Sequence, residues 1–302
     1  MIRCLCIVFT GLFVAHANAA PTELDPAKLR LVSANVVVLD AEDGHRVYSK
    51  AADEVTPIAS LTKLMTAMVV LDAKLPADEA LEVDIDDFDF LKGSHSRLRL
   101  GATLSRDEML RVALMASENR AASALSRHYP GGSTAFVAAM NAKAKALGMT
   151  HTHYEDPTGL SPKNQSTAND LATLVRAAAE YPLIREYSTT PAHSVEVQPT
   201  GQTIGYNNSN KLVKNDAWDI HLQKTGYIRE AGRCVVMLAT IASKPMVIVL
   251  LDSIGRFARL GDAQRVKYWL ETGESMPAPV AKRAVQKPRA KAGKSGKRKR
   301  SR

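Results

Sequence analysis

The chain has 302 residues, of which 45% are hydrophobic and 24% are charged, so it has enough apolar material for a buried core and too much for a disordered protein. Its formal net charge of +9 is uneven, because residues 281–302 contain 11 Lys or Arg and no acidic residue. Without this segment and Arg3, 28 basic residues face 31 acidic ones, so the basicity belongs to the C-terminus and not to the folded body.

The N-terminus has the pattern of a secretory signal. Arg3 precedes an apolar run from Cys4 to Ala15 that is too short to cross a bilayer as a helix. Ala17-Asn18-Ala19 then places small residues at alternate positions, as cleavage by a signal peptidase requires. We therefore predict that residues 1–19 are a signal peptide and that the mature protein is periplasmic.

Removal of this signal also removes two of the three cysteines, Cys4 and Cys6. The mature chain then keeps Cys234 alone and cannot form an internal disulfide. Cys234 lies in the apolar run 234–238, which predicts a buried, unreactive thiol.

The apolar pattern of the mature chain predicts strands at both ends and helices between them. In chain order the expected elements are a β-hairpin within 31–48, helices over 60–73, 107–127, 135–147 and 169–180, two buried antiparallel strands over 235–241 and 246–251, and a final helix over 257–270. Ser105 and Glu108 have the spacing of a capping box before the second helix, and Gly148 suits the end of the third.

A lone hairpin is only marginally stable, so strands at the two chain ends usually meet in one sheet. We therefore predict an α/β protein of the α+β kind, with one antiparallel sheet built from both ends and covered by the first and last helices. The middle helices form a second lobe, with the site in a cleft between the two. This catalytic domain spans residues 20–274, and the Pro-, Ala-, Lys- and Arg-rich segment 275–302 is expected to be disordered.

Three short motifs occur in order along the chain: Ser60-Leu61-Thr62-Lys63, Ser117-Glu118-Asn119 and Lys224-Thr225-Gly226. Each motif is weak evidence alone, because a Ser followed three residues later by Lys is expected about once by chance in this composition and an isolated Lys-Thr-Gly is usually a turn. Ser60 and Lys63, however, are three residues apart on a predicted helix and share one face. A lysine can activate a serine only when its neutral form is favoured, which burial or a second cation such as Lys224 would achieve.

The other two motifs offer groups for proton transfer and substrate binding. Ser117 can relay protons and Asn119 can hold a substrate amide, both late in the helix predicted over 107–127. Lys224 and the Thr225 hydroxyl can bind a carboxylate. We expect Gly226 to let a substrate backbone approach the strand.

These motifs are the set found in penicillin-binding proteins and class A β-lactamases. From about Leu31 to Leu270 the chain resembles the low-mass serine DD-peptidases of the S11 family, most closely the D-alanyl-D-alanine endopeptidases of the penicillin-binding protein 7 type. The stretches that carry the resemblance are residues 57–67, 114–122, 156–160 and 224–227.

The resemblance implies an acyl-enzyme mechanism with Ser60 as nucleophile and Lys63 as general base. Ser117 and Asn119 would shuttle protons and orient the substrate, and Lys224 and Thr225 would bind its carboxylate. The backbone N–H groups of Ser60 and Tyr227 would form the oxyanion hole. Glu118 is the variant of the endopeptidase group, and we expect its side chain to face away from the cleft without a role.

The expected function is hydrolysis of D-Ala cross-links in peptidoglycan, with β-lactam antibiotics as covalent inhibitors. A D-alanyl-D-alanine carboxypeptidase is the alternative, disfavoured because about 30 residues after the last helix leave no room for a second β-rich domain or an amphipathic anchor. A β-lactamase would need a second base, for which Glu155 is the nearest candidate. A wall-binding protein without activity is the remaining reading.

Several residues have a plain structural interpretation. His151 and His153 lack a third ligand at a usual spacing, so we expect neither a metal nor another cofactor. Asp84, Asp86, Asp87 and Asp89 lack the Gly and Glu of a calcium loop and predict a solvated face. Residues 156–159 predict a structural turn. The basic tail is expected to keep the protein in solution or to dock it ionically on wall or membrane, and no nucleic-acid partner is expected.

Overall fold

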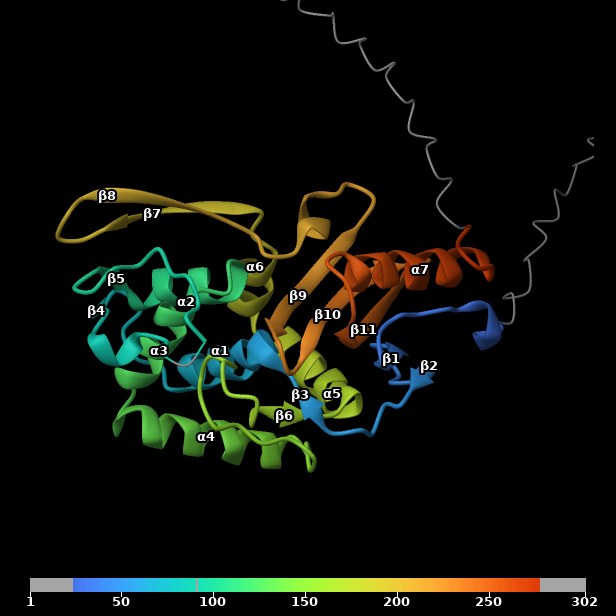
Figure 1. Ribbon diagram of the computed structural model, residues 1–302, viewed down its shortest axis with the longest axis horizontal. Coiled ribbons are helices and arrows are strands. Elements are labelled where there is room, and N and C mark those ends of the chain that lie inside the picture. The colour runs from blue at the N-terminus through green and yellow to red at the C-terminus, as the bar shows by residue number, and fades with distance from the viewer. Residues whose placement is uncertain (1–23, 91, 278–302) are drawn as a thin grey trace, which may run out of the picture.

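The structure, a computed structural model, describes residues 24–90 and 92–277 (Figure 1). The predicted signal peptide lies outside the described residues, and so does all of the predicted tail except residues 275–277. None of the helices in the described part combines the length and hydrophobicity that a bilayer crossing requires.

A five-stranded antiparallel sheet in the order β2-β1-β11-β10-β9 joins the two ends of the chain. Its strands are β1 (Asn35–Asp40), β2 (Arg46–Lys50), β9 (Asp219–Ile228), β10 (Gly232–Ile241) and β11 (Lys244–Ser253). Asn35 lies opposite Leu251 and Asp40 opposite Met246, so the N-terminal hairpin completes the C-terminal one. The prediction of one sheet from both ends is confirmed.

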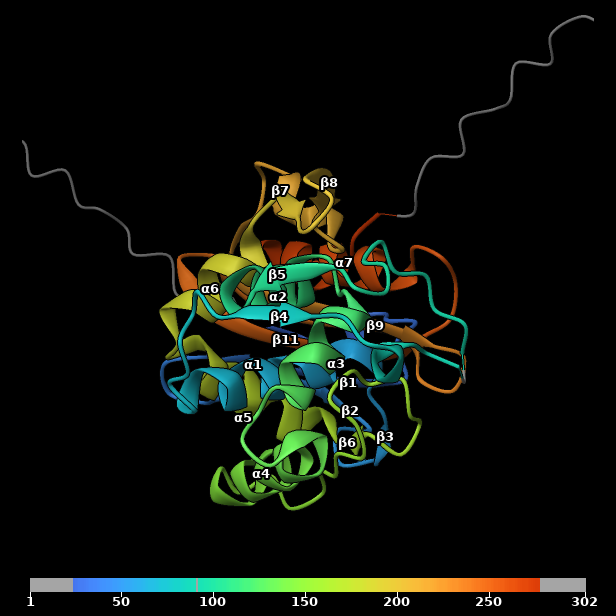
Figure 2. The same cartoon turned by 90° about the vertical axis from the view of Figure 1, so that its left-hand side faces the viewer.

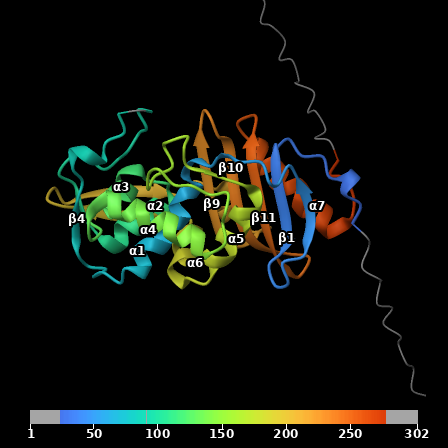
Figure 3. The same cartoon turned by 90° about the horizontal axis from the view of Figure 1, so that it is seen from below.

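The sheet is covered on both faces because its central strands are apolar at successive positions. Val235 and Ile248 face a cluster with Trp269 of α7 (Ala258–Thr272), whereas Val236 and Val249 belong to the main core. That second face is covered by α5 (Ala168–Ala179), as Figures 1 and 3 show from two directions. Such double burial explains the continuous apolar runs of β10 and β11.

The expectation that the first helix covers the sheet is wrong. Helix α1 (Lys63–Asp72) lies inside the helical lobe, and its residues 63–70 are all buried. A helix that is buried all round belongs in the interior of a lobe and cannot be a surface layer. In this part of the chain it is the short turn η2 (Ala59–Thr62), just before α1, that packs against β9 and β10.

The helical lobe surrounds α1 with short elements (Figure 2). Its helices are α2 (Arg106–Met115), α3 (Asn119–Arg127), α4 (Gly132–Ala146) and α6 (Pro182–Thr189), with 3-10 turns η1 (Pro26–Lys28), η3 (Ile85–Asp87) and η4 (Lys211–Lys214) elsewhere. Its two-stranded pairs are β3 (Thr56–Pro57) with β6 (Gln165–Ser166), β4 (Ala80–Glu82) with β5 (Thr103–Ser105), and β7 (Ala192–Val197) with β8 (Gln202–Asn207). In Figure 2 the β7–β8 hairpin and α4 lie at opposite ends of the lobe.

The single helix predicted over 107–127 is wrong, because two helices occupy this stretch. Helix α2 ends at Met115 with Ala116 as its C-cap, and Ser117 has a left-handed φ of 64°. Glu118 is the N-cap of α3 and accepts a hydrogen bond from Arg120 N–H. Polar residues that can accept hydrogen bonds from backbone N–H groups favour such caps over helix interiors. The break brings the second motif out of the helix and into the cleft.

Ser105 caps α2 as predicted by accepting from Glu108 N–H. The Glu108 carboxylate lies 2.8 Å from Nε2 of His193 on β7. It therefore ties the α2 N-terminus to the β7–β8 hairpin, an element that the sequence reading missed.

Candidate active site

Ser60 lies within the tight turn η2, which leads directly into α1. The preceding Ala59 has a left-handed φ of 49°, and its carbonyl accepts a hydrogen bond from the Thr62 hydroxyl at 2.8 Å. A residue other than glycine keeps this strained conformation only where the surrounding structure fixes it. The Ser60 side chain remains partly accessible.

Two glycines from distant segments enclose this turn. A Cβ on Gly159 would lie 2.0 Å from the Ala59 carbonyl oxygen, and a Cβ on Gly226 would lie 3.0 Å from the Ile58 carbonyl oxygen and 3.1 Å from Ser60 N. We expected the bare face of Gly226 to admit a substrate backbone. It instead faces the nucleophile turn, so glycine is required there for β9 to pack against Ser60.

Lys63 is buried, and its ammonium group has three hydrogen-bond partners. Nζ lies 3.1 Å from Ser60 Oγ, 2.7 Å from Asn119 Oδ1 and 2.7 Å from the Thr158 carbonyl oxygen. Burial lowers the pKa of Lys63 to about 7, although the charges of Asp156 and Glu118 act in the opposite direction. A neutral amine next to the serine hydroxyl is thus accessible near neutral pH.

Lys224 of β9 reaches the second motif. Its Nζ donates to Ser117 Oγ at 2.8 Å and to the Thr225 carbonyl at 3.0 Å. Burial holds the pKa of Lys224 well below its ordinary value, and the charges of Lys63 and Arg259 lower it further. Of the two causes expected for Lys63, burial or a second cation such as Lys224, burial is the one that lowers its pKa, and the charge of Lys63 in turn lowers the pKa of Lys224.

Two serines that the sequence reading missed support these groups. Ser94 Oγ accepts from Asn119 Nδ2 at 3.0 Å, and Ser209 Oγ accepts from Thr225 Oγ1 at 2.7 Å. Neither lies in a recognisable motif, because each comes from a connecting segment that only the folded chain brings to the cleft. Tyr227, the residue after Gly226, is 56% exposed.

Glu118 is buried and has a structural role, contrary to expectation. Its carboxylate accepts from Arg120 N–H at the start of α3 and from Arg97 N–H at 3.4 Å. These contacts hold Glu118 in place and, because Asn119 is the next residue, they also position the Asn119 side chain.

The acidic and histidine groups singled out in the sequence have ordinary surroundings. Asp87 is buried and paired with Arg127 at 2.9 Å, so the expected solvated face is wrong at that position. The Asp156 carboxylate accepts from Thr158, Gly159 and Ser161, which makes 156–161 a structural turn. Within the described residues no group of three His, Cys, Asp or Glu could hold a metal ion.

Glu155, the candidate for a second base, is held by two basic side chains. Its side chain is 44% exposed and pairs with Lys163 at 3.2 Å and His153 at 3.7 Å. Cys234 is buried, its Sγ donates to the Ala231 carbonyl, and burial raises the pKa of its thiol to about 12.

Comparison with known proteins places this geometry in context. A family model described as D-alanyl-D-alanine carboxypeptidase matches residues 21–255. The D-alanyl-D-alanine endopeptidase of Pseudomonas aeruginosa is 47% identical over 285 residues, or 93% of this chain and 92% of that protein. The D-alanyl-D-alanine endopeptidase of Escherichia coli is 46% identical over 286 residues, or 95% and 91%. The crystal structure of the Streptomyces K15 DD-transpeptidase matches with a TM-score of 0.75 and 26% identity over 80% of this chain and 98% of that one.

Proposed function

Because this chain belongs to the D-alanyl-D-alanine carboxypeptidase family of serine peptidases, we propose that it cuts D-Ala peptide bonds of peptidoglycan through an acyl-enzyme on Ser60. The observation that carries this proposal is the contact between the buried amine of Lys63 and Ser60 Oγ at 3.1 Å. A lysine whose pKa is lowered to about 7 can take the serine proton at neutral pH.

Acylation then follows from the groups around Ser60. Ser60 Oγ attacks the D-Ala carbonyl carbon as its proton passes to Lys63 Nζ. The backbone N–H groups of Ser60 and Tyr227 stabilise the oxyanion, and the loss of one such donor costs roughly 10²–10³ in rate. The packing of Gly226 against Ser60 N supports this pairing, because it brings the next residue of β9 to the same place.

The second and third motifs protonate and bind the leaving group. Ser117, hydrogen-bonded to Lys224, gives its hydroxyl proton to the amine as the C–N bond breaks, and the proton that Lys63 took from Ser60 replaces it. Water then loses a proton to neutral Lys63 as it attacks the ester carbonyl, and that proton returns to Ser60 Oγ when the ester bond breaks. The carboxylate beside the scissile amide binds at Lys224 and Thr225. Since the pKa of free Lys224 is lowered, an arriving carboxylate favours its protonation, and substrate binding strengthens the cation that holds it.

The preferred bond is the cross-link, as in the two endopeptidases that match more than nine-tenths of this chain. A carboxypeptidase, the name of the family model, is the alternative. Purified cross-linked dimers and free pentapeptides should be incubated with the protein and followed by mass spectrometry. We expect dimers to become monomers faster than pentapeptides lose terminal D-Ala. The opposite order would establish the carboxypeptidase.

β-Lactams are the expected covalent inhibitors, because they present an amide mimic to the same nucleophile. Glu155 is exposed and paired with Lys163. This argues against Glu155 as a second base that rapidly releases the acyl group, and hence against a β-lactamase. Fluorescent penicillin should label the protein stably, and peptide mapping should place the adduct on Ser60. An adduct that persists in Ser60→Ala would contradict the assignment. No labelling and no turnover would support the non-catalytic wall-binding reading.

We further propose that the mature protein acts in the periplasm and that residues 281–302 dock it ionically on the anionic wall or on a membrane surface. Deletion of this segment should leave turnover of a small substrate unchanged and weaken binding to isolated sacculi at low salt. The difference should shrink as salt rises, because exposed charges are screened over about 10 Å at 0.1 M. Equal binding with and without the segment would leave only a solubilising role.

A further inference from the structure

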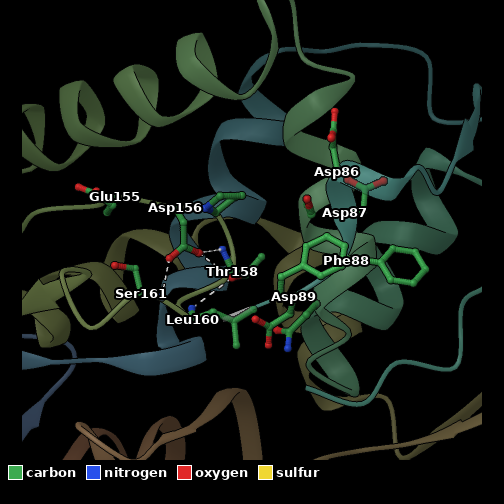
Figure 4. A pocket seen from close by; sticks show the side chains of 13 residues that line it. Asp86, Asp87, Phe88, Asp89, Glu155, Asp156, Thr158, Leu160 and Ser161 are labelled. Atoms are coloured by element: carbon green, nitrogen blue, oxygen red, sulfur yellow. Dashed lines mark hydrogen bonds between the residues drawn. The ribbon is translucent and has the colours of Figure 1, made fainter. Parts of the chain in front are cut away.

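One side of the turn around Ser60 is fixed from behind by a charged side chain. The Asp156 carboxylate is partly buried and accepts hydrogen bonds from the N–H groups of Thr158, Gly159 and Ser161 (Figure 4). These bonds hold the loop whose glycine lies against the turn. The other side of the turn, which β9 covers, also has a charged side chain behind it.

The charged side chain behind β9 is Arg259, in the first turn of α7. Its Nη1 atom donates to the carbonyl oxygen of Gly226 at 2.8 Å and to that of Cys234 at 3.2 Å. These two residues are register partners on β9 and β10, so one guanidinium nitrogen connects the active-site strand to its neighbour. The contact falls where β10 changes its register against β11, between residues 233 and 235, an irregularity that interrupts the ladder.

The position of this guanidinium is energetically unfavourable in two respects. Burial lowers the pKa of Arg259, and the charge of Arg233 lowers it further. Among the described residues its hydrogen-bond partners are the two carbonyl oxygens, and neither is a carboxylate. A cation in the first turn also opposes the helix dipole, which favours negative charge at that end. Packing alone does not require a charge here, so the charge calls for a functional explanation.

Arg259 contacts a peptide group whose other end is a donor of the oxyanion hole. The peptide between Gly226 and Tyr227 is trans, so its carbonyl and its N–H point in opposite directions. Arg259 holds the carbonyl end, and the N–H end is the Tyr227 donor assigned above to the oxyanion. A Cβ on Gly226 would lie 3.1 Å from Ser60 N, so this peptide also lies next to the second donor.

A hydrogen bond to the carbonyl changes the strength of the N–H on the same peptide group. Linked hydrogen bonds polarise one another and strengthen each bond by about 10–30%. The effect is larger for a charged donor, because charge-assisted hydrogen bonds are roughly twice as strong as neutral ones. Arg259 therefore makes Tyr227 N–H a stronger donor and fixes its direction before negative charge develops on the substrate carbonyl.

We propose that Arg259 is a positioning residue of the oxyanion hole, which holds and polarises the peptide between Gly226 and Tyr227 so that Tyr227 N–H is a strong donor aimed at the acyl carbonyl. This inference rests on the proposed function. In this role the guanidinium acts through the peptide group and does not contact the substrate.

The test is Arg259→Met, which keeps an apolar stem and removes the donor. Stopped-flow acylation over a range of penicillin concentrations separates the limiting rate from the half-saturating concentration. The limiting rate should fall about 10-fold at a nearly unchanged half-saturating concentration, less than the roughly 10²–10³-fold for a lost donor, because Tyr227 N–H remains. Arg256→Met, at an exposed arginine in the preceding loop, is the matched control for charge and should change neither quantity.

The infrared spectrum of the acyl-enzyme gives a readout that a purely structural role would not change. The stretching frequency of the ester carbonyl on Ser60 falls as the hydrogen bonds to its oxygen strengthen. Arg259→Met should therefore move this band to higher wavenumber than in the unaltered protein. Arg259→Lys, which keeps the cation on a shorter side chain, should lie between the two in rate and in frequency, and it provides the same comparison if Arg259→Met does not fold.

The outcomes separate this role from two others that Arg259 could have. A lower Tm with an unchanged limiting rate and carbonyl frequency would overturn the proposal and leave Arg259 as a structural link between α7 and the sheet. A raised half-saturating concentration with an unchanged limiting rate would also overturn it, and would mean that the guanidinium binds the penicillin carboxylate directly. In both cases Ser60 is still labelled, so the DD-peptidase assignment stands. If penicillin does not label Ser60 in the unaltered protein, the proposed function fails and this inference with it.

Discussion

Lys224 Nζ donates a hydrogen bond to Ser117 Oγ at 2.8 Å across 107 positions of sequence. The contact joins the edge strand of the sheet to the break between α2 and α3, and so connects the two lobes above Ser60. Both side chains owe their positions to local backbone features: Lys224 to the buried edge of β9, and Ser117 to its left-handed φ of 64°.

Ser117→Ala should slow acylation by penicillin by roughly 10²–10⁴-fold, the range for loss of one proton-transfer group. The variant removes the hydroxyl that Lys224 donates to, while the backbone break at 116–118 can persist. Stopped-flow labelling gives the rate, and circular dichroism reports the fold. Ser123→Ala, on α3 outside the motif, is the control. Near-normal acylation of folded Ser117→Ala would exclude Ser117 from proton transfer.

At saturating penicillin, where the bound carboxylate keeps Lys224 protonated, acylation should rise with pH through the ionisation of Lys63 near pH 7. Only neutral Lys63 can accept the Ser60 proton, and burial lowers its pKa to about 7, so the active form is lost below that pH and populated above it. Rates measured from pH 5.5 to 8.5 should therefore increase and level off. Lys63→Ala should show no acylation at any pH while remaining folded. A flat profile would mean that another group is the base.

Gly159→Ala should destabilise the protein far more than Gly148→Ala. Both glycines have a left-handed φ, 83° and 75°, but a Cβ at Gly159 would meet the Ala59 carbonyl, whereas nothing lies within 4 Å at Gly148. Left-handed strain alone costs about 1 kcal/mol, and the clash should add about 2 kcal/mol. At roughly 2–4 °C per kcal/mol, Tm of Gly159→Ala should fall by about 6–12 °C. Equal Tm values for the two variants would show that the turn around Ser60 can rearrange to accept the added methyl group without a loss of stability.

Cys234 should resist thiol reagents in the folded protein. Its side chain is fully buried, and burial raises its pKa to about 12, so almost no thiolate is present at pH 8. Protein lacking residues 1–19 should release no colour with Ellman's reagent until denaturant is added, and then one equivalent. Rapid reaction of folded protein would contradict the buried position, and reduced penicillin labelling after modification would connect this thiol to the site.

The sequence by itself determined much of the architecture. Apolar runs long enough to be buried on both faces predicted β10 and β11, and their pairing with an N-terminal hairpin followed from the marginal stability of isolated hairpins. Strong local signals also gave α5, α7 and the Ser105 cap. Three ordered motifs identified the groups that the fold collects around Ser60, because the chemistry of a nucleophile and its base restricts which residue types can serve.

Tertiary structure decided what local patterns do not encode. Helical periodicity runs through 107–127, yet side chains that cap the backbone break it at Ser117. Ser94 and Ser209 have no motif and reach the cleft only through long connections. The bare face of Gly226 is taken by Ile58 and Ser60, a close approach of segments 166 or more residues apart. The pKa of Lys63 is lowered because the folded chain removes water from its amine, and desolvation is a property of the surroundings that no spacing of residues along the chain can specify.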